Sequence, residues 1–157
     1  MTDDERDNAG VVAPSPLIYL GPLILGLLLN RKSPAPFLPR KVAHILGWPL
    51  LGGGMLLIRW FFRTMRRAAT PIDPREPVSR LVVDGPFRYS RNHAYLAMAM
   101  ICAGVASLAN ALWAILLLPA TLLVIQRGVA EREERYLERK FGEEKYLRYK
   151  ARVRRWI

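Results

Sequence analysis

Residues 94–126 read AYLAMAMICAGVASLANALWAILLLPATLLVIQ, and this stretch decides the fold. It contains 33 residues without a charged side chain, whereas a helix needs about 20 apolar residues to cross a hydrocarbon core. The stretch is too long for one ordinary span and short for two full ones. We interpret it as a tight helical hairpin of two short helices that turns near residues 107–110, the alternative being a single kinked helix. Ala99, Ala103 and Ser107 recur every four residues, a spacing of small side chains that lets helices approach closely.

Two further apolar blocks precede the hairpin. The first spans residues 16–30 and is short for a membrane helix unless it extends back to Val11, and the second spans residues 42–62 with Arg59 its only formal charge. Apolar residues make up 52% of the chain and charged residues 24%, gathered into separate blocks as in membrane proteins. The sequence therefore predicts an all-α integral membrane helical bundle with about four transmembrane helices. Residues 1–13 are expected to form a disordered head, and residues 14–157 a single membrane domain.

The charge distribution indicates how such a bundle is oriented. The net charge of +11 is concentrated in residues 31–41, 63–91 and 127–157. Four spans place residues 63–91 on the same side as the C-terminal helical tail, and these segments carry the larger positive charge, which favours the cytoplasmic side of the inner membrane. Residues 31–41 would then face outward with four positive charges, against the rule.

Basic flanks of this kind suit anionic membrane lipids as partners. Nucleic acid is not expected as a partner, because no base-reading module is recognisable. The sequence does not indicate an oligomeric state. A zinc or iron site is not expected either, since the chain has two histidines and one cysteine that lie far apart in sequence.

Polar residues stand on both sides of the apolar run. Residues 85–95 read GPFRYSRNHAY and lead into the apolar run, and residues 133–137, which read EERYL, lie shortly after its end. Because a hairpin returns the chain to the side from which it started, loop and tail are predicted to meet at one membrane surface. A solvated helix face is the competing interpretation of Glu133 and Glu134, since Glu131 and Arg135 form an ordinary i, i+4 pair.

These segments resemble those of a known superfamily. Residues 81–96 are similar to the L-V-x-x-G-P-[FY]-R-x-x-R-[HN]-P-x-Y segment of the isoprenylcysteine carboxyl methyltransferase and phospholipid methyltransferase superfamily. Residues 133–137 match its E-E-x-x-L element, and residues 141–157 are similar to its closing F-G-x-x-Y-x-x-Y pattern. The resemblance covers roughly residues 42–157. It implies an integral membrane methyltransferase with its active site and C-terminus in the cytosol.

The resemblance implies S-adenosylmethionine as the methyl donor and an amphiphilic acceptor that enters from the bilayer. The donor carries a carboxylate, an ammonium, a ribose and an adenine, so its pocket needs an arginine, carboxylates and apolar or aromatic walls. Arg91 or Arg88 would pair with the carboxylate, Glu133 or Glu134 with the ammonium or the ribose, and Tyr95 with the adenine. The implied cofactor-binding residues are Gly85, Pro86, Arg88, Tyr89, Arg91, Asn92, His93, Tyr95, Glu133 and Glu134.

The sequence departs from the superfamily pattern at the entry to the hairpin. His93 stands where the pattern has proline, and Asn92 where some members have histidine. His93 and Glu134 are the catalytic candidates, with His93 either a hydrogen-bonding group or base, or only a cap on the next helix. The acceptor is left open among a prenylcysteine carboxylate, a phospholipid amine and a small apolar thiol. The alternative function is a non-catalytic membrane scaffold or lipid-binding protein that retains the fold.

Overall fold

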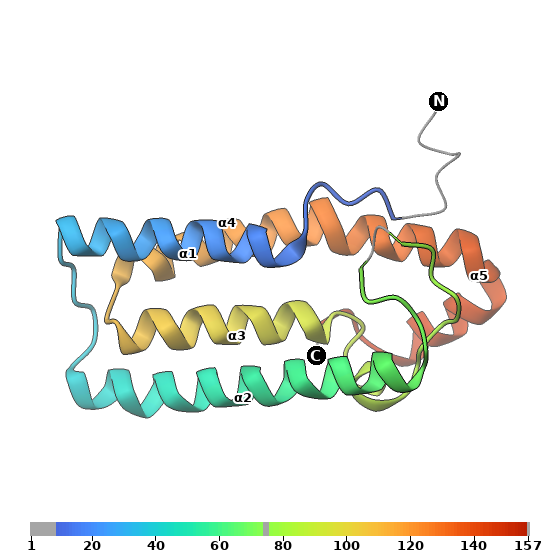
Figure 1. Ribbon diagram of the computed structural model, residues 1–157, viewed down its shortest axis with the longest axis horizontal. Coiled ribbons are helices and arrows are strands. Elements are labelled where there is room, and N and C mark those ends of the chain that lie inside the picture. The colour runs from blue at the N-terminus through green and yellow to red at the C-terminus, as the bar shows by residue number, and fades with distance from the viewer. Residues whose placement is uncertain (1–8, 74–75, 157) are drawn as a thin grey trace.

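The computed structural model describes residues 9–73 and 76–156, which form helices and connecting loops without a strand. The elements are α1 (Ser15–Lys32), α2 (Arg40–Arg67), the short 3₁₀ helix η2 (Gly85–Arg88), α3 (His93–Leu108), α4 (Leu112–Ile125), the π-type turn η3 (Gln126–Ala130) and α5 (Glu131–Arg152). Helices α1 to α4 form an elongated bundle in which α2 packs on α3, α3 on α4, and α1 on both α3 and α4. The prediction of an all-helical chain is confirmed for the described residues (Figure 1).

The apolar run 94–126 forms the predicted hairpin. Its turn consists of residues 109–111, where Asn110 adopts the left-handed conformation with φ 48°. The second arm, α4, continues through η3 directly into α5, so the helix extends past the apolar run into the charged sequence. The helical path includes Pro119 and Gly128 and is interrupted at Gly142, whose φ of +77° is not helical. The Glu-Glu pair at residues 133–134 is therefore carried on a helical continuation of the hairpin.

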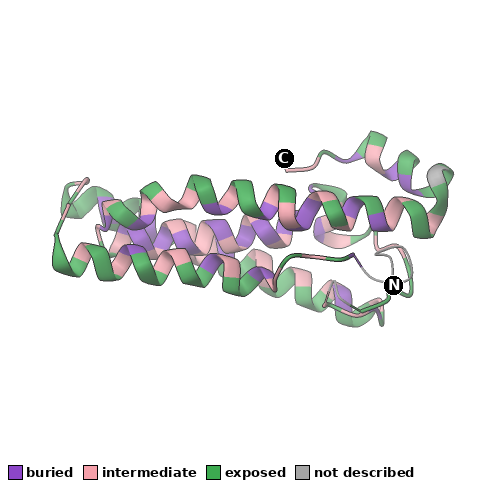
Figure 2. Ribbon diagram, turned by 90° about the horizontal axis from the view of Figure 1, so that it is seen from above, coloured by how far each residue is buried: buried purple, intermediate pink, exposed green. Residues whose placement is uncertain are grey.

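Helices α2 and Leu112–Gly142 are long and apolar enough to cross a membrane. Only 11% of the most apolar window of α2 and 22% of that of Leu112–Gly142 is buried, whereas the core helix of a soluble protein would be largely covered. Figure 2 shows the exposed residues on the outward faces of the bundle and the buried ones where helices meet. Exposed Ile45, Trp48, Leu56 and Leu116 contribute to this apolar outer surface, which suits contact with lipid tails.

Glycines bring the helices into backbone contact. A Cβ added to Gly104 on α3 would lie 2.6 Å from the backbone nitrogen of Leu51 on α2, and one added to Gly54 would lie 2.8 Å from the carbonyl oxygen of Ala97. Gly26 on α1 is equally close to α4, with 2.4 Å to the Cα of Ala114. Small residues at such crossings let helices approach closely and increase their van der Waals contact. This contact matters in a lipid environment, where the hydrophobic effect does not drive helices together.

The loop between α1 and α2 is fastened to the hairpin turn by Asn110. Its side-chain oxygen accepts hydrogen bonds from the backbone nitrogens of Phe37 and Leu38 at 3.0 and 3.1 Å, and its Nδ2 donates to the Leu38 carbonyl at 2.7 Å. Trp113 adds a hydrogen bond from its Nε1 to the Ser33 carbonyl. Connection and turn are thereby held together at one end of the bundle (Figure 1).

Replacing Asn110 by alanine is expected to lower the free energy of unfolding by about 2 kcal/mol, because partly buried backbone groups lose their partners and alanine is strained at positive φ. Thermal unfolding in detergent measures the change. The Asn110→Gly variant separates the two causes, since glycine removes the hydrogen bonds without the strain. Equal stability of wild type and Asn110→Ala would contradict the assignment.

The opposite end of the bundle gathers the N-terminal segment, the 68–92 connection and α5. Of the predicted head, residues 1–8 lie outside the described residues, while residues 9–13 lie against η3 and α5. The backbone nitrogen of Val12 donates to the Gly128 carbonyl at 3.3 Å, and Arg132 Nη1 donates to the Gly10 carbonyl at 2.8 Å. The two polar sequence segments singled out above come together at this end.

Candidate functional site

A cavity of about 440 Å³ lies where the start of α1, the last turns of α2, the 70–82 loop, the start of α3 and α5 meet. Most of its wall is apolar and aromatic, with Phe61, Phe62, Phe87, Met98 and Leu137 among the lining residues. Its polar lining includes Arg91, Asn92, His93, Tyr95 and Glu133. The cavity therefore combines an apolar wall with a cluster of polar groups from the two polar segments, residues 85–95 and 133–137.

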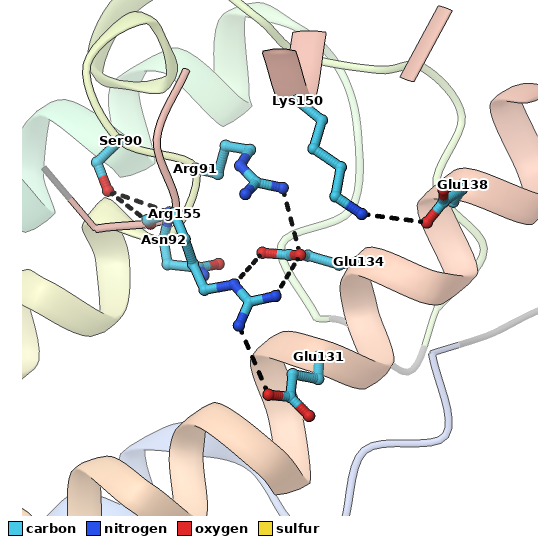
Figure 3. Close-up of polar contacts among 8 residues, drawn as sticks. All are labelled: Ser90, Arg91, Asn92, Glu131, Glu134, Glu138, Lys150 and Arg155. Carbon is cyan, nitrogen blue, oxygen red and sulfur yellow. Dashed lines mark hydrogen bonds and ion pairs between the residues drawn. The ribbon is translucent and has the colours of Figure 1, made fainter. Parts of the chain in front are cut away.

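The C-terminal tail fixes the backbone of the loop that enters α3. The backbone nitrogens of Arg91 and Asn92 donate to the carbonyls of Arg154 and Arg155, both at 3.1 Å. Ser90 Oγ also donates to the Arg155 carbonyl, at 3.2 Å. Figure 3 shows the tail lying along this loop beside α5. Three consecutive loop residues are thus positioned by residues about 65 places away in the chain.

Glu134 is the centre of an ion-pair network (Figure 3). Arg155 binds both of its oxygens, with Nε and Nη2 each at 3.0 Å, and Arg91 Nη1 lies 3.2 Å from Oε2. Arg155 also reaches Glu131 at 3.5 Å. Hydrogen bonding to Glu134 raises the pKa of the Arg155 guanidinium. The predicted meeting of Arg91 with the second Glu of the pair is observed, but the carboxylate of Glu134 is occupied by arginine and does not line the cavity.

Several buried polar atoms of the cavity lining have no hydrogen-bond partner within the described part of the chain. They are Nε and Nη1 of Arg91, Nδ2 of Asn92 and Nε2 of His93. The distance from Arg91 Nη1 to Glu134 is that of an ion pair, but the angle is not that of a hydrogen bond. Buried polar groups in folded proteins are nearly always paired, so these atoms are available to hydrogen-bond a ligand or water in the cavity.

The tautomer of His93 follows from its partner. Its Nδ1 lies 3.0 Å from the carbonyl oxygen of Ser90, which can only accept, so Nδ1 carries the hydrogen. In the neutral ring, Nε2 then presents a lone pair. The ring is 2% exposed and packs edge-on against Phe87 with centroids 4.2 Å apart. His93 also begins α3, so both roles considered from the sequence are compatible with its position.

Tyr95 and Glu133 form the second polar group of the cavity. The Tyr95 hydroxyl donates to Glu133 Oε2 at 2.7 Å. Burial raises the pKa of the Glu133 carboxyl above the 4.5 of an ordinary glutamate, and the charge of Glu134 acts in the same direction, while the hydrogen bond from Tyr95 opposes both. Of the two neighbouring glutamates, Glu133 lines the cavity, whereas Glu134 binds Arg155 of the tail.

The remaining predicted residues hold the loop instead of lining the cavity. Gly85 and Pro86 begin η2, and Gly85 has a φ of +62° with its hydrogen facing Thr64, where a Cβ would lie 2.6 Å from Oγ1. Arg88 and Tyr89 are exposed, Tyr89 to 69%. The motif thus divides into a turn-forming half and a cavity-lining half.

Sequence reasoning missed the residues that complete the site from elsewhere. Phe61 on α2 lies against His93 with ring centroids 5.4 Å apart, and the Tyr149 hydroxyl donates to the Phe87 carbonyl at 2.7 Å. Arg155 is not among the site residues that the sequence predicts. The resemblance of residues 141–157 to the closing pattern of the superfamily singled out the tail. No local signal in the sequence showed that the tail would pack against residues 90–92.

A bundle of long, outwardly apolar helices with a cavity that carries polar groups at one end fits a helical membrane protein. The chain belongs to the phospholipid methyltransferase family, whose family model matches residues 42–144. The match runs from the start of α2 into α5 and includes both polar segments of the cavity. The family supports a methyltransferase activity and, in general, S-adenosylmethionine as methyl donor.

One curated relative is an uncharacterized protein of Haemophilus influenzae. The two chains are 58% identical over 36 residues, which are 23% of this chain and 56% of the relative. The match therefore spans just over half the length of that relative. No solved structure matches the chain significantly.

Proposed function

We propose that this protein is an integral membrane methyltransferase that binds S-adenosylmethionine at the described cavity and methylates an amphiphilic acceptor. The observation that carries the proposal is the cluster of unpaired buried nitrogens on Arg91, Asn92 and His93 beside the carboxylate of Glu133. The volume of about 440 Å³ lies within the range of about 300–1,000 Å³ that is usual for small-molecule pockets. Membership of the phospholipid methyltransferase family supports the reaction type.

The residues of the cavity fit the chemistry of the donor. Arg91 and Asn92 would donate to its carboxylate, Glu133 would pair with its ammonium, and the wall formed by Phe61, Phe87 and neighbouring apolar residues suits its adenine. When bound, the donor supplies an electrophilic methyl group. The residues of the chain then have to orient the two reactants and exclude water, which are the main contributions expected for an in-line transfer.

Two of the sequence candidates receive different roles. Glu134 acts through Arg91 and Arg155 as a positioning residue, because its oxygens face these guanidinium groups. His93 touches the cavity, and its Nε2 lone pair would accept the proton that an amine or a thiol loses on methylation. A carboxylate acceptor has no such proton to lose. Comparing prenylcysteine, aminophospholipid and thiol acceptors in wild type and a His93→Gln variant tests this role.

We place α1 to α4 across the membrane as four spans, with the cavity, α5 and the C-terminus on the cytosolic side of the inner membrane. The low burial of the two longest helices supports this arrangement. So does the position of the 33–39 loop and the hairpin turn at one end of the bundle, with the cavity at the other. Cysteine labelling from either side of inverted vesicles, at exposed Ser33 and at exposed Arg88, tests it.

Titration of the detergent-solubilised protein with S-adenosylmethionine tests the function directly. Saturable binding is expected, followed by transfer of a labelled methyl group to one of the three acceptor classes. Absence of saturable binding would favour the non-catalytic scaffold or lipid-binding protein.

The pH dependence of donor binding should report on Glu133. Because its pKa lies above 4.5, acidification neutralises this carboxylate earlier than an ordinary glutamate. The affinity for S-adenosylmethionine is therefore expected to fall as the pH is lowered through the raised pKa. Glu133→Gln keeps an acceptor for the Tyr95 hydroxyl, so its affinity should be weaker and flat over the same range. Isothermal titration at several pH values measures both proteins, and an unchanged profile in Glu133→Gln would exclude Glu133 as the titrating group.

A further inference from the structure

Two arginines contact the carboxylate of Glu134, and Arg155 makes the stronger interaction. Arg155 makes two parallel hydrogen bonds of 3.0 Å, one to each oxygen. Arg91 Nη1 forms an ion pair with one oxygen at 3.2 Å without hydrogen-bond geometry, and neither Nε nor Nη1 of Arg91 has a hydrogen-bond partner among the described residues. The forked contact with Arg155 is the stronger kind of arginine–carboxylate pairing.

Arg91 is also more deeply buried than Arg155. The side chain of Arg91 is 9% exposed and lines the cavity, whereas that of Arg155 is 32% exposed and lies on the tail side of α5. Glu134 is 6% exposed in the intact protein, and without Arg155 it would have Arg91 as its remaining cation. A buried carboxylate left with one partner is expected to draw that partner into a full forked pair.

We propose that Arg155 is a positioning residue of the donor site, which occupies both oxygens of Glu134 and so keeps the Arg91 guanidinium available for a carboxylate-bearing ligand in the cavity. The inference rests on the proposed function in one respect, namely that this ligand is the amino-acid end of S-adenosylmethionine. The C-terminal tail is thereby an integral part of the binding site, although none of the described residues after α5, 153–156, lines the cavity.

The backbone of the same residue acts on the same loop. The Arg155 carbonyl accepts from the Asn92 nitrogen at 3.1 Å and from Ser90 Oγ at 3.2 Å. These bonds do not need the Arg155 side chain, so a side-chain substitution leaves the docking of the tail in place. The effect of the guanidinium on Glu134 can therefore be tested separately from the attachment of the tail.

Two ligands that differ only at the amino-acid end supply the test. S-adenosylhomocysteine carries the carboxylate, and 5′-methylthioadenosine has the same nucleoside and thioether without it. Arg155→Ala is expected to weaken binding of S-adenosylhomocysteine by about ten-fold or more while leaving the affinity for 5′-methylthioadenosine unchanged, which also shows that the variant is folded. Arg155→Lys, which keeps the charge but loses the fork, is expected to show a smaller loss.

Arg154→Ala is the matched control, since it removes an arginine from the exposed side of the same tail and retains its backbone bond to Arg91. It is expected to bind both ligands as the wild type does. A loss of affinity for both ligands in Arg155→Ala would indicate a general structural effect and overturn the proposal. An unchanged affinity for S-adenosylhomocysteine would overturn it as well.

A second substitution distinguishes positioning from packing. Adding Glu134→Gln to Arg155→Ala removes the charge that would capture Arg91, so binding of S-adenosylhomocysteine is expected to recover toward the wild-type value. Failure to recover would overturn the proposal while leaving the methyltransferase function intact. A wild-type protein that binds neither nucleoside would instead contradict the proposed function itself, together with the inference built on it.

Discussion

Replacing Arg91 by alanine is expected to weaken the binding of S-adenosylmethionine about 100-fold, because the cavity would lose a buried guanidinium with two nitrogens that have no hydrogen-bond partner among the described residues. The fold should tolerate the change. Glu134 keeps both hydrogen bonds to Arg155, so no carboxylate is left buried without a partner. Equilibrium binding in detergent measures the affinity, and a thermal unfolding curve of the same sample verifies that the protein is intact.

The matched control for this prediction is Arg88→Ala. It removes the same charge from the same sequence motif, three residues earlier, but Arg88 is exposed and does not line the cavity. Its affinity for the donor is expected to stay within about two-fold of the wild type, in line with the small effect of exposed charges. If Arg88→Ala lost affinity as strongly as Arg91→Ala, the assignment of the cavity as the donor site would be refuted.

Replacing Gly104 by alanine is expected to give the largest loss of stability, about 3 kcal/mol or more. The added methyl would meet the Leu51 nitrogen at 2.6 Å, the Gly47 carbonyl at 2.9 Å and the Leu51 Cα at 3.0 Å. All three atoms belong to the backbone of α2, so no side-chain rotation relieves the overlap, and the two helices must move apart. The change is measured as the free energy of unfolding in detergent.

Gly52→Ala provides the contrast on the partner helix. A Cβ at Gly52 meets no described atom within 4 Å, and alanine favours a helix over glycine by about 1 kcal/mol in water. This variant is expected to be as stable as the wild type or slightly more stable. Equal effects of the two substitutions would show that α2 and α3 are not held by backbone contact at Gly104.

The hairpin was predictable because its signal is local and long. A run of uncharged residues that is longer than one membrane span and is followed by charged sequence can adopt few folds other than a hairpin. The observed turn at residues 109–111 overlaps the predicted turn near residues 107–110. The second arm also continues past the apolar run, from α4 through η3 into α5. The charged residues 131–141 contain neither glycine nor proline, so the helix runs on to Gly142, where φ is +77°.

The candidate site was predictable only in outline. Arg91, Asn92, His93, Tyr95 and Glu133 line one cavity as expected, while Arg88 and Tyr89 point away from it. Consecutive residues on a helix differ in direction by about 100°, so adjacent Glu133 and Glu134 face different neighbours. Which of them faces the cavity depends on how α5 rotates against α3 and the tail.

The sequence by itself determined that the chain forms apolar helices, that 94–126 turns back on itself, and that two polar segments meet at one end, because hydrophobic length and charge patterning act over neighbouring residues. Only the tertiary structure decided that Glu133 serves the cavity and Glu134 serves the arginines, and that Arg155 returns to the loop at residues 90–92. These choices arise from contacts between residues tens of positions apart, for which a single sequence carries no local physical signal.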